Sequence, residues 1–132
     1  MTLAHYCIVV AALLPIICAG IAKGGMMGKR RSDGGYDNHD PRYWLAQQTG
    51  FRARANAAQA NSFEALPLFI AGVLIAQQTG ARQGLVDALA VAFVVLRVIY
   101  VGLYVGDRDV ARSVVWFLAL AVSIALVFSS RF

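Results

Sequence analysis

The stretch RARANAAQANSFEALP (residues 52–67) decides the fold, because its polar side chains run directly into the apolar sequence LFIAGVLIA (68–76). At 100° per residue of an α-helix, Arg54, Asn61 and Glu64 fall within about 80° of one another. A second polar group lies on the opposite face and comprises Arg52, Asn56 and Gln59. A helix that is polar on two faces and enters hydrocarbon cannot turn either face to lipid. We therefore expect it in the middle of a bundle or between subunits.

The composition of the whole chain is that of an integral membrane protein. Of 132 residues, 59% are hydrophobic and 14% are charged, whereas soluble domains average roughly 45–50% apolar and about 25% charged residues. The same figures exclude intrinsic disorder. The net charge is +5, but no basic stripe alternates with exposed aromatic residues, so we expect no nucleic-acid partner.

Four segments are long and apolar enough to cross a bilayer, which takes about 20 residues of helix. The expected spans are 3–22, 55–78, 85–105 and 112–128, with a long connection over 23–51. The last two connections are short, so successive helices should be antiparallel neighbours. The predicted fold class is an all-α membrane protein, a four-transmembrane-helix antiparallel bundle that forms a single domain over 1–132.

The distribution of Lys and Arg predicts the orientation. Nine of them lie on or beside the first and third connections: Lys23, Lys29, Arg30, Arg31, Arg42, Arg52, Arg54, Arg108 and Arg112. The opposite side holds only Arg82 and Arg131. The positive-inside rule places the first and third connections in the cytoplasm and both termini on the non-cytoplasmic side.

The long connection should be mostly flexible because it is rich in glycine. Within it, Asp40 followed by Pro41 predicts an N-cap and the first turn of a short helix. The neighbouring His39 matches no metal-site spacing, and we expect no metal. Cys7 and Cys18 lie about 16 Å apart on one helix, too far for a disulfide.

The third span carries a polar face that complements the second. Arg97, Tyr100 and Tyr104 are spaced 3 and 4 residues apart and therefore share one helix face. A carboxylate at Glu64 is costly in a membrane, so Arg54, Arg97 or a partner chain should neutralise it. Guanidinium groups bind carboxylates through paired hydrogen bonds. The cluster can be a structural clamp between helices or a pocket for an anionic ligand, and the two roles are compatible.

The sequences RANAAQANSFEALPLF (54–69) and RVIYVGLY (97–104) resemble the MAPEG family, the membrane-associated proteins of eicosanoid and glutathione metabolism. DNHDPR (37–42) and RSVVW (112–116) are similar to its bacterial branch. The resemblance implies a homotrimer in a bacterial inner membrane, with glutathione clefts between protomers that open to the cytoplasm. The chain differs from well-studied members of the family at Ala57, where those members carry arginine. Those members also have a basic residue at the cytoplasmic end of the first helix, and Lys23 is the candidate for it here.

The resemblance also implies a site and an activity. The candidate glutathione-binding residues are Arg54, Gln59, Asn61, Glu64, Arg97, Tyr100 and Tyr104, and the last three are also the catalytic candidates. The implied function is a glutathione-dependent transferase or peroxidase that acts on lipophilic electrophiles at the cytoplasmic leaflet. The alternative is a non-catalytic trimer that binds lipid or a partner protein and keeps the polar cluster as a clamp. A small transporter subunit is a third reading, based only on charges within the spans.

Overall fold

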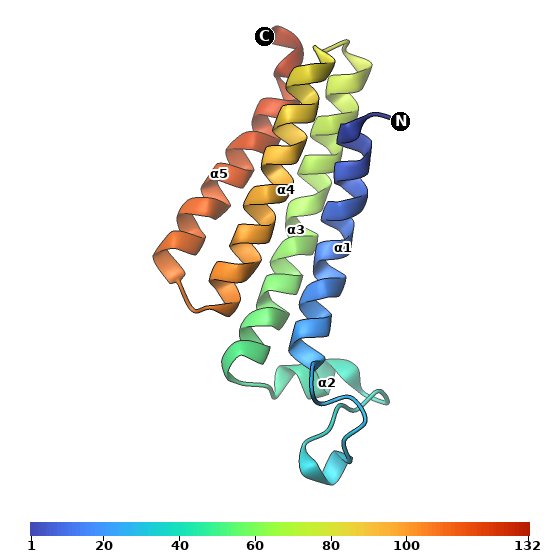
Figure 1. The fold of residues 1–132 in the computed structure, drawn as a ribbon, viewed down its shortest axis with the longest axis vertical. Helices are drawn as coiled ribbons and strands as arrows, with labels where there is room; N and C mark the ends of the chain where they lie inside the picture. The colour runs from blue at the N-terminus through green and yellow to red at the C-terminus, as the bar shows by residue number, and fades with distance from the viewer.

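All regular secondary structure of the chain is helical in its computed structural model, which describes residues 1–132 (Figure 1). The long helices are α1 (Leu3–Lys23), α3 (Gly50–Gln78), α4 (Gln83–Val105) and α5 (Asp109–Val127); the shorter elements are α2 (Pro41–Ala46), η1 (Arg31–Asp33) and η2 (Ser129–Arg131). The four long helices are each apolar and long enough to cross a membrane. This confirms the predicted class of an all-α protein with four membrane-spanning helices.

Helix α3 is the central element of the bundle. It packs against α1, α4 and α5, while α1 also contacts α4, and α4 contacts α5. Figure 1 shows both termini at one end of the bundle, with α2 and the turn between α4 and α5 at the other. Helix α3 therefore lies in the middle of the bundle, one of the two places that its polar faces predicted.

Two arginines in the first turns of α3 hold the ends of the helices beside it. Arg52 donates hydrogen bonds from Nη1 to the carbonyl oxygens of Ala22 at 2.9 Å and Gly24 at 2.6 Å, at the C-terminus of α1. Arg54 donates from Nε to the carbonyl oxygen of Val105 at 3.0 Å, at the C-terminus of α4. The last carbonyls of a helix lack intrahelical partners and carry partial negative charge, so a cation stabilises them.

The connection between α1 and α3 has more local structure than its glycines indicated, because Trp44 anchors it. Trp44 is 7% exposed and donates from Nε1 to the carbonyl oxygen of Gly34 at 3.3 Å. The Tyr36 ring meets Trp44 edge to face, with centroids 5.3 Å apart, and Lys23 lies 4.6 Å from the Tyr36 centroid. The predicted short helix is present as α2, and its cap is Asp40, which accepts a hydrogen bond from the backbone of Tyr43 at 3.3 Å.

Helices α3 and α5 approach each other closely at Gly72, near the end of the bundle that carries the termini. A Cβ at this position would lie 2.9 Å from Cβ of Leu126 and 3.0 Å from the carbonyl oxygen of Ser123. Small residues allow such close approach between membrane helices. Toward the other end, α5 leaves α3, and Figure 1 shows the two helices diverging.

We expect Gly72→Ala to destabilise the protein, because the added methyl group forces α3 and α5 apart. Overpacking of this kind typically costs about 1–3 kcal/mol. The measurement is thermal unfolding in detergent, followed by circular dichroism. Gly102→Ala is the matched control, since a Cβ on Gly102 of α4 meets nothing within 4 Å. Equal unfolding temperatures for the two variants would contradict the close approach.

We also expect Arg54→Gln to lower the stability of the bundle by about 1 kcal/mol, because it removes a cation from the C-terminus of α4. Arg82→Gln removes the same charge from the beginning of α4, where Arg82 is exposed and makes no side-chain cap. This control should be neutral or slightly stabilising. The stabilities of the two variants are compared by denaturation in the same detergent. A greater loss of stability for Arg82→Gln than for Arg54→Gln would refute the role of Arg54 as a cap of α4.

Candidate functional site

Arg97 is the buried centre of the polar cluster between α3 and α4. Its side chain is 2% exposed and donates from Nη2 to Oδ1 of Asn61 at 3.0 Å and to Oγ of Ser62 at 3.3 Å. The guanidinium carbon also lies 4.1 Å from the centroid of the Tyr100 ring, in a cation–π arrangement. No carboxylate lies within 4.0 Å of it, since the single ion pair of the chain joins Arg31 and Asp37. A buried cation is therefore held by neutral groups alone.

Glu64 connects to this cation only through Asn61. The Asn61 amide accepts from Arg97 with its oxygen and donates from Nδ2 to Oε2 of Glu64 at 3.2 Å. The side chain of Glu64 is exposed in the single chain, at the edge of the gap between α3 and α5. The expected neutralisation of Glu64 by an arginine is thus not a direct ion pair within one chain.

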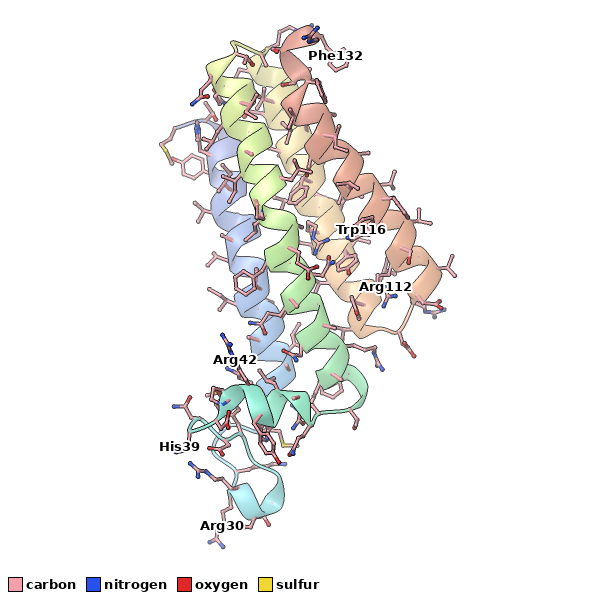
Figure 2. The ribbon with its side chains drawn as sticks, turned by 180° about the vertical axis from the view of Figure 1, so that it is seen from behind. Arg30, His39, Arg42, Arg112, Trp116 and Phe132 are labelled. Atoms are coloured by element: carbon pink, nitrogen blue, oxygen red, sulfur yellow. The ribbon has the colours of Figure 1, made fainter.

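The aromatic residues of α4 continue the cluster toward the α4–α5 turn. The rings of Tyr100 and Tyr104 meet edge to face with centroids 5.6 Å apart. Arg112 of α5 places its guanidinium carbon 4.2 Å from the centroid of the Tyr104 ring. Two adjoining tyrosine rings therefore lie between the cations Arg97 and Arg112. Figure 2 shows Arg112 and Trp116 on the side of α5 that faces the other helices.

Two cavities lie in the space between α3, α4 and α5. The inner cavity has a volume of about 120 Å³, and its lining comprises Asn61, Glu64, Ala65, Leu68, Phe93, Arg97, Trp116, Ala119, Leu120 and Ser123. The mouth cavity has a volume of about 330 Å³, and its lining comprises Asn61, Tyr100, Tyr104, Arg112, Ser113, Trp116 and Phe117. Asn61 and Trp116 belong to both, so the two cavities adjoin at these side chains.

The structure brings five of the seven predicted site residues to these cavities, namely Asn61, Glu64, Arg97, Tyr100 and Tyr104. Arg54 and Gln59 line neither cavity. Arg54 instead caps α4, and Gln59 is half-buried on the opposite face of α3, as the helical pattern placed it. Lys23 also lies apart, over the Tyr36 ring. Ala57 is half-buried one turn before Asn61 and contributes to neither lining.

Sequence reasoning did not select Arg112 and Trp116 as site residues. Both are half-buried on one face of α5, because they are four residues apart. The sequence RSVVW (112–116) contributed to the family resemblance, and this was the signal that could have identified Arg112 and Trp116 as site residues. Beyond Arg112, α5 carries no charge through Val127, so its polar pattern could not show which face meets α3 and α4.

This arrangement suits recognition of an anion next to an apolar group. Arg97 and Arg112 offer guanidinium groups at two depths, and hydrogen bonds to charged partners are stronger than neutral ones. Asn61, Tyr100 and Tyr104 add neutral donors and acceptors. The lining of the inner cavity combines Arg97 with aliphatic and aromatic side chains. A ligand with both a charged and an apolar part therefore fits the combined space.

Comparison with known proteins identifies the family. No curated protein and no solved structure matches the chain. The family model described as MAPEG family matches residues 3–132, which is nearly the whole chain and includes all four long helices. This protein, with four helices able to cross a membrane, therefore belongs to the MAPEG family.

Proposed function

We propose that this protein binds glutathione between α3, α4 and α5 and conjugates it to lipophilic electrophiles. The observation that carries the proposal is Arg97, a buried guanidinium with no carboxylate within 4.0 Å, on the wall of a cavity of about 120 Å³. A buried cation without a counterion is costly. An anionic group in the adjoining cavity would offset that cost, and this favours binding of an acidic ligand.

Glutathione is chemically complementary to the charged residues of both cavities. It carries two carboxylates, one ammonium group and a thiol. Arg97 and Arg112 provide two cations for its carboxylates or its thiolate, and the exposed carboxylate of Glu64 suits the ammonium group. Arg54 and Gln59 line neither cavity and take no part in this proposal.

The proposed reaction needs a thiolate, which nearby cations favour over the thiol. The thiol proton passes to water. The sulfur then forms a bond to an electrophilic carbon, and the bond from that carbon to its leaving group breaks, so that the leaving group departs as an anion with the bonding electrons. The mouth cavity would hold the polar tripeptide, while the lipophilic electrophile arrives from the membrane.

We also propose that the protein is a homotrimer in a bacterial inner membrane, with the long connection in the cytoplasm. The concentration of Lys and Arg at one end of the bundle supports this orientation. Glu64 is exposed in the single chain at the depth of the polar cluster. A carboxylate that faces lipid is costly, and this supports the burial of Glu64 against a second copy of the chain. The family membership supports a glutathione-related role in general terms.

The test of glutathione binding is isothermal titration calorimetry on the purified protein in detergent. We expect saturable binding at millimolar or lower concentration, weakened at least tenfold in Arg112→Gln, because that variant removes a cation from the mouth cavity. Arg97→Lys should also weaken it, since a lysine keeps the charge but loses the planar guanidinium. Arg108→Gln is the control, because Arg108 is exposed in the α4–α5 turn and lines neither cavity.

The absence of binding to the unmodified protein up to several millimolar thiol would refute the proposal. Equal losses of glutathione affinity in Arg108→Gln and Arg112→Gln would show that the charge of the protein in general, and not a specific site, determines binding.

A second candidate function is a non-catalytic membrane protein in which the polar cluster is a clamp between helices or protomers. The observation that favours it is Asn61, whose amide connects Arg97 of α4 to Glu64 of α3. Alanine at position 57, where well-studied members of the family carry arginine, also favours it.

The clamp predicts that Glu64→Gln weakens the assembly in detergent, with or without glutathione, because an amide replaces the charged acceptor of the Asn61 hydrogen bond. Size-exclusion chromatography with light scattering measures the stoichiometry during stepwise heating. Asp107→Asn removes the same charge from the exposed α4–α5 turn, where φ is +61° and asparagine is tolerated. A Glu64→Gln assembly as heat-stable as the Asp107→Asn assembly would count against the clamp.

A further inference from the structure

The motif DNHDPR (37–42) lines neither cavity and takes no part in the proposed reaction. Its acidic side chains shape the connection itself. Asp37 accepts a hydrogen bond from the backbone of His39 at 2.9 Å, and Asp40 caps α2. Arg42 differs from them, because its side chain is exposed and forms no ion pair. The motif therefore builds a turn and a short helix that present an arginine to the surroundings.

Three exposed cations of the long connection have no counterion within the chain. The single ion pair joins Arg31 to Asp37 at 3.0 Å. Lys29, Arg30 and Arg42 are exposed, and none of them has a carboxylate within 4.0 Å. Figure 2 shows Arg30 at the tip of the connection, away from the bundle, and Arg42 at the level where the long helices end. Of the labelled cations of the connection, Arg42 is thus the one at the edge of the membrane-spanning region.

Helix α2 holds Arg42 at this level, because α2 is fixed to its surroundings by Trp44. The Trp44 side chain is buried and donates to the carbonyl oxygen of Gly34, and α2 also packs against α3. The neighbouring Tyr43 points outward and is 62% exposed. Tyrosine side chains concentrate at the headgroup level of membranes, since the ring is apolar and the hydroxyl is polar. Arg42 and Tyr43 therefore present a cation and an amphipathic ring side by side at that level.

The surface of α1 changes from charged to apolar within a short distance of α2. Helix α1 ends at Lys23, at the end of the bundle that carries α2 (Figure 1). Leu13, Ile16 and Ile17 are exposed. From Ile17 to Lys23 the helix rises about 9 Å, close to the thickness of one headgroup region, about 5–8 Å. A molecule with a phosphate at the level of Arg42 and apolar chains beside α1 fits both surfaces, and phospholipids have this form.

We propose that Arg42 and Tyr43 form a recognition site for the phosphate of an anionic phospholipid at the α2 end of the bundle. Arg42 donates charge-assisted hydrogen bonds to the phosphate oxygens, and the Tyr43 hydroxyl donates one more. A zwitterionic lipid gains less from the unpaired cation, because its ammonium group opposes the guanidinium. One arginine near an anionic membrane surface contributes a factor of about five in affinity. We therefore expect a preference of about fivefold for the anionic lipid.

The test measures which lipid contacts α2 in vesicles that contain the reconstituted full chain. The chain has two tryptophans, so Trp116→Phe leaves Trp44 as the fluorescent reporter. Phosphatidylglycerol or phosphatidylcholine, brominated near the top of the acyl chains, is mixed in turn with the unbrominated form of the other lipid. Quenching of Trp44 then gives the relative affinity of the two lipids. We expect about fivefold preference for phosphatidylglycerol, nearly equal affinities in Arg42→Gln, and recovery in Arg42→Lys, which keeps the charge.

Arg30→Gln is the matched control, because it removes the same charge from the same connection. Arg30 lies at the tip, away from the bundle (Figure 2). At an ionic strength of 0.15 M, interactions between exposed charges are screened beyond about 8 Å. The preference measured at Trp44 should therefore be unchanged in Arg30→Gln. Equal losses in Arg30→Gln and Arg42→Gln would overturn the site, because the basic connection as a whole would then attract the lipid.

Two further outcomes would overturn the proposal. One is equal quenching by the two brominated lipids in the Trp116→Phe protein that retains Arg42. The other is loss of the preference in millimolar inorganic phosphate but not in chloride of equal ionic strength, which would identify free phosphate as the ligand. None of these outcomes affects the proposed binding of glutathione, because Arg42 and Tyr43 line neither cavity.

Discussion

The burial of one guanidinium group, that of Arg97, constrains the rest of the bundle. A cation in a membrane interior must be surrounded by polar partners, because its desolvation is costly. Asn61 and Ser62 of α3 supply two of these partners and Tyr100 supplies the face of a ring. These contacts fix how α3 and α4 are rotated and aligned relative to each other, since a shift of either helix by one residue would remove them.

Three other charges of the helices satisfy helix ends. Arg52 and Arg54 reach in opposite directions from α3 to the C-termini of α1 and α4. At the other end of α1, Asp87 of α4 accepts a hydrogen bond from the backbone of Ala4 at 2.9 Å. In each case the sign of the side chain opposes the partial charge of the helix terminus. Helix α1 is thus held at both ends by charges from its neighbours.

Sequence patterns predicted the four spans because long apolar runs have few alternatives. They also predicted the central place of α3, since no lipid-facing helix is polar on two faces. They could not show which polar residues point into a cavity. Arg54 shares a helix face with Asn61 and Glu64, yet its length lets it reach the carbonyl of Val105 instead. The site-facing side of α5 also remained undetermined, because its apolar sequence has no polar stripe beyond Arg112.

Ala57 lines neither of the two cavities between α3, α4 and α5. The cavities between α3, α4 and α5 already have a cation at each depth, Arg97 beside the inner cavity and Arg112 beside the mouth. Both are oriented by contacts within the chain, Arg97 by Asn61 and Ser62, and Arg112 by the Tyr104 ring. Groups that are oriented in advance stabilise a developing or bound negative charge without the cost of reorganisation. The contacts that make the buried charge tolerable to the fold are therefore the same contacts that would prepare it to bind an anion.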